Sequence, residues 1–133
     1  MASVIPKEVK KEIADGWVAE TWKVCLLTNA FSYVSGTHIL YSDLTNEVVG
    51  AGYVAGGATV SGKASGYVDT TNVYLYATNT AWAASTLTNV RYAVLYNATS
   101  GKIRDIKDLG ADYTTSNGTL TIQWHSGGVV KIS

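Results

Sequence analysis

Residue types that catalyse reactions or bind metals are scarce in this chain of 133 residues. His38 and His125 are the only histidines, and Cys25 is the only cysteine. A zinc site usually combines closely spaced His and Cys ligands, so a site here would have to gather carboxylates from distant segments. No serine stands in a Gly-x-Ser-x-Gly nucleophile elbow. The sequence therefore predicts no metal, no cofactor and no catalytic residues, and we do not expect an enzyme.

The remaining polar and glycine-rich segments give no sign of a reactive site either. Asp105, Asp108 and Asp112 lie close together, but basic residues are interspersed among them. Mixed charge of this kind is typical of a solvated turn, so we interpret residues 100–109 as a charged loop. The glycines of residues 50–57 are not followed by a helical pattern, which a phosphate-binding loop requires. Cys25 stands in an apolar run and is expected to be buried.

The charge balance argues against two classes of partner. Ten basic and ten acidic side chains give a formal net charge of zero, and nucleic-acid-binding domains usually carry a basic surface. No apolar run approaches the roughly eighteen residues of a membrane span, and the N-terminus lacks the pattern of a signal peptide. We therefore expect no nucleic-acid partner, no membrane partner and synthesis in a cytoplasm.

One amphipathic helix is predicted near the N-terminus, over residues 6–15. Pro6 suits the first helical position, and Gly16 suits the position at which a helix stops. A helix of about ten residues is not stable alone, so its apolar stripe must dock on a larger surface. We expect it to dock on the chain's own sheet, with part of the helix also facing a neighbouring subunit. The stripe consists of Ile5, Val9 and Ile13.

Beyond residue 22 the sequence predicts strands. Thr, Val and Tyr are abundant, and apolar residues alternate with others in segments 72–77, 90–96 and 119–124. Between them, the glycine-rich segment 50–66 is interpreted as short strands joined by tight turns. The alternation is clearest at the C-terminal end, where the expected core residues are Leu120, Ile122 and Trp124.

The turns define the expected fold class. The glycines after Trp124 predict a C-terminal hairpin between Leu120–Trp124 and Val129–Ile132. Short strands separated by frequent turns are typical of a sandwich or barrel. We expect a single, mainly β domain over residues 1–133. In it, one short N-terminal α-helix precedes an antiparallel β-sandwich or barrel-like part over residues 22–133.

Several short segments follow one another in a specific order from about Lys10 to the C-terminus. They are residues 10–16 (KKEIADG), 22–28 (WKVCLLT), 41–44 (YSDL), 46–53 (NEVVGAGY), 55–57 (AGG), 82–86 (WAAST), 91–96 (RYAVLY) and 117–124 (NGTLTIQW). This series resembles a family of small structural proteins found in the genomes of tailed bacteriophages. The resemblance implies a virion component without catalytic residues.

Within the virion, we expect a capsid decoration or cement protein that stabilises the head shell. Its partners would be the major capsid protein or other virion proteins. Decoration proteins commonly form closed clusters at capsid symmetry axes, so a homo-oligomer is expected, with a trimer favoured. A tail or baseplate subunit is the alternative position. The expected location is the virion, after synthesis in the host bacterial cytoplasm.

The aromatic residues allow one function of another kind. Four tryptophans and nine tyrosines on a β scaffold could stack against sugar rings, so a carbohydrate-binding module on the virion surface is an alternative. Aromatic side chains also dominate cores and protein interfaces, and Trp82 could serve either purpose. The candidate partner-contact residues are Val9, Ile13, Trp17 and Trp82.

Overall fold

The computed structural model describes residues 5–67, 72–124 and 130–132. Within these ranges the chain forms one α-helix, α1 (Lys7–Val18), one short 3-10 helix, η1 (Tyr41–Asp43), and nine strands. The strands are β1 (Trp22–Thr28), β2 (Ala58–Thr59), β3 (Ala64–Tyr67), β4 (Val73–Tyr76), β5 (Thr80–Ser85), β6 (Val90–Asn97), β7 (Ile103–Tyr113), β8 (Gly118–Ile122) and β9 (Val130–Ile132). The mainly β fold with one N-terminal helix is confirmed.

The largest sheet is built around β1 and β6. Its four strands have the order β2-β1-β6-β7, and β1 pairs antiparallel with β6 from Trp22–Asn97 to Thr28–Val90. Both strands are apolar on both faces, because both faces of the sheet are covered. On β1, Val24 and Leu26 belong to the main core, whereas Cys25 and Leu27 belong to a second core on the opposite face.

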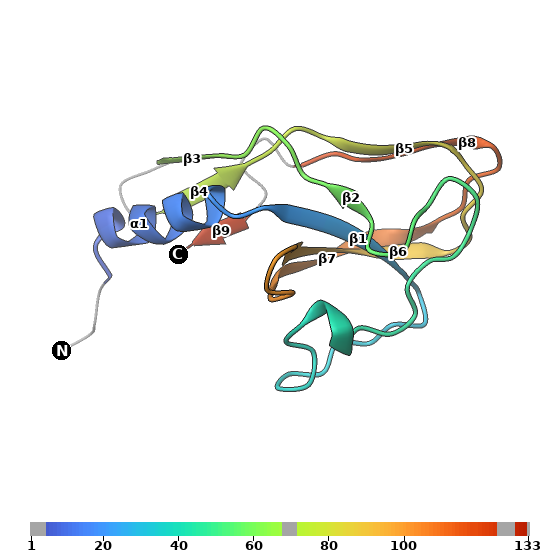
Figure 1. Ribbon diagram of the computed structural model, residues 1–133, viewed down its shortest axis with the longest axis horizontal. Helices are drawn as coiled ribbons and strands as arrows, with labels where there is room; N and C mark the ends of the chain where they lie inside the picture. Colours follow the sequence, from blue (N-terminus) through green and yellow to red (C-terminus); the bar gives the residue numbers. More distant parts are fainter. Residues whose placement is uncertain (1–4, 68–71, 125–129, 133) are drawn as a thin grey trace.

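Two smaller sheets lie against the main core. The β5-β8 pair extends above β1 and β6 in Figure 1, and the β3-β4-β9 sheet lies near α1 at the other end. Trp82, Leu120 and Leu75 from these sheets share one cluster of buried side chains with β1 and β6. The antiparallel arrangement is sandwich-like, and no sheet of the described chain closes into a barrel.

The opposite face of the four-stranded sheet is covered by the long connection between β1 and β2. This connection carries η1 and lies below β1 and β6 in Figure 1. Phe31 is buried there, and Tyr41 and Leu44 pack against the same cluster. At the end of the connection, Gly57 has a φ of +81°, and a Cβ at this position would lie 1.8 Å from the carbonyl oxygen of Val24. Only glycine fits this approach of the chain to β1.

Strand pairing at the C-terminal end differs from the prediction. The Leu120–Trp124 and Val129–Ile132 segments do not form a hairpin, because β8 pairs with β5 and β9 pairs with β4. The alternation of β8 is confirmed at Leu120 and Ile122, which are buried. Trp124 lies beyond the end of β8 and is only partly buried against the core. Val129 and His125 lie outside the described residues.

Two further predictions about local structure are wrong. Residues 100–109 do not form a loop, because most of them belong to the eleven-residue strand β7. The helix does not stop at Gly16 but continues to Val18. Gly16 is exposed and has nothing within 4 Å of a Cβ position, so the helix tolerates it at a cost of about 1 kcal/mol. The additional residues place Trp17 on the same face as Lys10 and Ala14.

Candidate functional site

The helix α1 packs on the domain through a face that the sequence did not predict. Ala14 is fully buried and Lys10 is buried with it, and the helix contacts β3 and β4. The exposed fractions of Val9, Ile13 and Ile5 are 41%, 40% and 52%. The helix therefore docks on the chain's own β strands, as expected, but the prediction that it does so through this stripe is wrong. The three residues form an outward-facing apolar surface, here called the α1 stripe.

Trp17 joins the helix to the sheet. Its ring lies 6.2 Å from that of Trp22, and the guanidinium of Arg104 stands 5.2 Å above it. Arg104 in turn donates to both carboxylate oxygens of Glu20, at 2.9 Å and 2.6 Å. These bonds hold the pKa of Glu20 below its usual range. Trp17 is half-buried and acts as a link between α1 and β7, so only part of its ring remains for a partner.

Trp82 is not a surface residue. It points into the main core with 6% of its surface exposed, and its ring lies 6.1 Å from that of Tyr53. The prediction of a partner contact at Trp82 is therefore wrong, and its face is not available to a sugar ring. Trp22 is buried as well, which removes a second member of any tryptophan platform.

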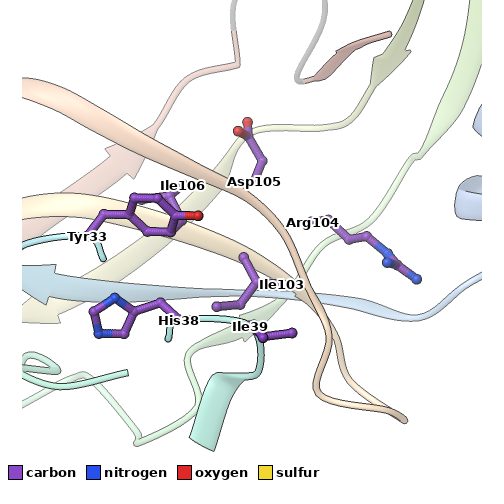
Figure 2. A pocket seen from close by; sticks show the side chains of 7 residues that line it. All are labelled: Tyr33, His38, Ile39, Ile103, Arg104, Asp105 and Ile106. Atoms are coloured by element: carbon purple, nitrogen blue, oxygen red, sulfur yellow. The ribbon is translucent and has the colours of Figure 1, made fainter. Parts of the chain in front are cut away.

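A hollow of about 530 Å³ lies beside the start of β7 (Figure 2). It is lined by Tyr33, His38, Ile39, Ile103, Arg104, Asp105 and Ile106. The side chains of Tyr33 and Ile39 are 54% and 58% exposed. Figure 2 shows Arg104 and Asp105 directed away from Ile103 and Ile39, so isoleucines and a tyrosine dominate the inside of the hollow. No sequence pattern indicated this surface, because its lining residues come from two segments about 65 positions apart.

The polar residues around the hollow hold the chain in place. The Nδ1 atom of His38 accepts the backbone N–H of Val34 at 2.8 Å, and its ring lies 5.0 Å from Phe31. The carboxylate of Asp105 lies 2.7 Å from the ammonium of Lys107. Both His38 and Asp105 therefore serve local contacts within the chain.

A carboxylate beneath the sheet organises the connection between β1 and β2. Glu47 accepts hydrogen bonds from the hydroxyls of Tyr41 and Tyr53, each at 2.5 Å, and from the N–H of Gly56 at 2.8 Å. The Tyr53 hydroxyl also accepts the buried N–H of Leu26 at 3.0 Å. Desolvation, together with the bond to Glu47, raises the pKa of both tyrosines. The network, which the sequence did not reveal, ties the connection to β1.

Burial also makes the thiol of the single cysteine, Cys25, unreactive. Cys25 is fully buried, as predicted, and burial raises the pKa of its thiol to about 12. The nearby negative charge of Glu47 acts in the same direction. Because the thiolate is the reactive form of cysteine, this residue contributes packing rather than chemistry.

Comparisons of the chain with family models, curated proteins and solved structures gave no match. Among the described residues, no group of three or more His, Cys, Asp or Glu side chains is arranged to hold a metal ion. In the same part of the chain, no helix has the length and apolar character needed to span a bilayer. Two exposed apolar surfaces of the described chain are candidates for a partner contact: the α1 stripe and the hollow beside β7.

Proposed function

We propose that this chain is a structural component of a tailed-phage virion and acts as a decoration or cement protein on the assembled head shell. The order of segments from Lys10 to Trp124 supports this function, because it resembles that of small structural proteins of these phages. The α1 stripe is the observation that carries the proposal. It presents Ile5, Val9 and Ile13 outward from a well-packed domain, and apolar side chains gathered in this way are typical of protein contacts.

The partner of the α1 stripe would be the major capsid protein. Glu8 and Glu12 are exposed beside the stripe, so the complementary surface would be apolar with basic residues at its rim. A closed cluster of copies at a symmetry axis would bring several stripes onto the shell at once. Several weak contacts then act together and give a stability that a single narrow stripe cannot provide.

We also propose that the chain has no hydrolytic activity. Glu47 and His38 are occupied in holding loops, and Asp108 is held by Arg91 at 2.7 Å. Incubation with peptidoglycan, polysaccharides and ester substrates should give background rates. A turnover that is lost on replacing His38 with Ala would contradict the structural function.

Binding to head shells tests the proposal. Purified chain would be mixed with shells of its own phage that lack it, and bound protein would be measured after sedimentation. We expect saturable binding that falls at least tenfold for the double variant Val9→Asp/Ile13→Asp. The matched control is Val49→Asp/Val54→Asp, which adds the same two charges at valines between η1 and β2 that are 92% and 76% exposed.

The outcomes separate the candidate positions in the virion. Because Val9 and Ile13 are only 41% and 40% exposed, circular dichroism and a thermal melt verify that the double variant is folded before binding is compared. Equal binding by the wild type and the double variant would contradict the role of the stripe. Binding to purified tails instead of shells would favour the tail or baseplate alternative.

A further inference from the structure

The strand β7 has an open edge in the described chain. It is the outer strand of the four-stranded sheet, where it pairs with β6 on one side. In the described chain, residues 39–41 cover the start of this edge. The N–H of Ile103 donates to the carbonyl of Ile39 at 3.0 Å, and the N–H of Tyr41 donates to the carbonyl of Gly101 at 2.8 Å. At the far end, Gly110 has a φ of +81°, which breaks the regular strand. Residues 104–109 between these points form the open edge.

The strand register shows which backbone groups face outward along this edge. The N–H of Asn97 donates to the carbonyl of Lys102 at 2.8 Å, so every second residue of β6 from Asn97 bonds toward β7. Leu95 is opposite Asp105, and Ala93 is opposite Lys107. The backbone of Asp105 and Lys107 therefore faces β6. Ile106 lies between them, so its N–H and C=O point away from β6, in the plane of the sheet, and can bond to a further strand.

The charges along the open edge are complementary to those of the same strand running in the opposite direction. Residues 104–108 read Arg, Asp, Ile, Lys, Asp. If a second copy pairs antiparallel with the centre at Ile106, Asp105 lies opposite Lys107 of the second copy, and Lys107 lies opposite its Asp105. Opposite charges that face each other directly across two antiparallel strands stabilise the pairing, whereas like charges weaken it.

The same register satisfies the backbone and covers apolar surface. The outward N–H and C=O of Ile106 would bond to those of Ile106 in the second copy. Asp105 and Lys107 would then form the closer, non-hydrogen-bonded pairs, in which side chains approach most nearly. Ile106 packs on the same face of the sheet as Ile103. The incoming isoleucine would therefore lie beside the hollow and shield Tyr33 and Ile39, which are more than half exposed in a single copy.

We propose that the open edge of β7 is a twofold interface at which two copies of this chain join their four-stranded sheets into one continuous sheet. A strand that pairs with its own equivalent uses the same surface twice, so the contact closes at two copies. A trimer would need a different surface. The inference depends on the geometry of β7 alone, so it stands or falls separately from the function in the virion.

Reversal of the edge charges tests the proposal. The side chains of Asp105 and Lys107 are 27% and 35% exposed, and neither residue belongs to one of the two core clusters. Asp105→Lys and Lys107→Asp each replace two attractive cross-strand pairs by two repulsive ones, and each should weaken the dimer roughly 30-fold. The double variant Asp105→Lys/Lys107→Asp restores opposite charges in the same register and should restore the wild-type affinity. Lys102→Asp is the control, because this exposed lysine lies at the covered end of the edge.

Sedimentation equilibrium of the full chain over micromolar concentrations gives the readout, and circular dichroism verifies that each variant is folded. We expect a monomer–dimer equilibrium in the wild type, the control and the double variant, and mainly monomer in the two single variants. A wild type that stays monomeric up to several hundred micromolar would overturn the proposal, because Lys107 would then serve to keep the edge unpaired. A dimer that both single variants retain, or one that the double variant fails to restore, would also overturn it.

Discussion

The hydroxyl of Tyr53 is expected to be the most important single polar atom in the connection between β1 and β2. Tyr53→Phe removes this atom and leaves the ring in place. The N–H of Leu26 then loses its acceptor in a fully buried position, and Glu47 loses one of its donors. An unsatisfied buried donor costs about 1–3 kcal/mol, and a hydrogen bond to a charged group contributes about 1.5–3 kcal/mol. Because Glu47 keeps two other donors, we expect a total loss of about 3 kcal/mol.

Tyr41→Phe is the matched control, since it removes the same atom from the other tyrosine bound to Glu47. Tyr41 is only half-buried, and its hydroxyl donates one hydrogen bond, so the expected loss is about 1.5 kcal/mol. Urea unfolding measures both free energies. Thermal melts should show a decrease of about 10 °C for Tyr53→Phe and about half of that for Tyr41→Phe. Equal losses, or losses under about 0.5 kcal/mol at both positions, would refute the importance of the network.

Three further outcomes are expected for the isolated chain. Ile122→Ala should lower the free energy of unfolding by about 2–5 kcal/mol, and Thr121→Ala by under about 1 kcal/mol, because only Ile122 is buried. Equal losses in urea unfolding would contradict the assignment of Ile122 to the buried face of β8 and Thr121 to its exposed face. Cys25 should resist alkylation by iodoacetamide in the folded chain and react on unfolding, as mass spectrometry would show; rapid labelling of the folded chain would mean that the thiol is accessible. Burial raises the pKa of Tyr96 to about 12 and also raises the pKa of Tyr53, whereas tyrosines in the unfolded chain ionise near pH 10. The stability that these two groups contribute is therefore complete below about pH 10, and it is lost as the pH rises through their pKa values in the folded chain. Urea unfolding at about pH 8 and about pH 11 would measure this loss, and an unchanged free energy would contradict it.

The strands with clear alternation, such as β8, were predictable from the sequence, whereas β7 was not. Leu120 and Ile122 on β8 alternate without interruption and were placed correctly. On β7, a bulge near Arg104 and the kink at Gly110 disturb the period of two, and the apolar residues Ile103, Ile106 and Leu109 recur every three positions. That spacing, together with the mixed charges, concealed the strand.

Pairing and helix docking depended on contacts between distant segments. The next segment along the chain, Val129–Ile132, was the simplest partner to expect for β8. Instead, β8 pairs with β5, which lies more than thirty residues earlier. The apolar spacing on α1 was read correctly, yet the helix docks through Ala14, with Trp17 packed against the main core, rather than through Val9 and Ile13. The Glu47 network had no signal in the sequence, because its tyrosines are six positions away on either side without a recognised motif.

Labelling of intact phage particles tests the central claim most directly. Antibodies against the chain, coupled to gold and applied to purified virions, locate it by electron microscopy. A decoration protein predicts regular labelling over the head shell and none on the tail. Particles of a phage that lacks the gene should show no label, which gives the control. Absence of the chain from purified virions, or labelling confined to the tail, would contradict a decoration function on the head.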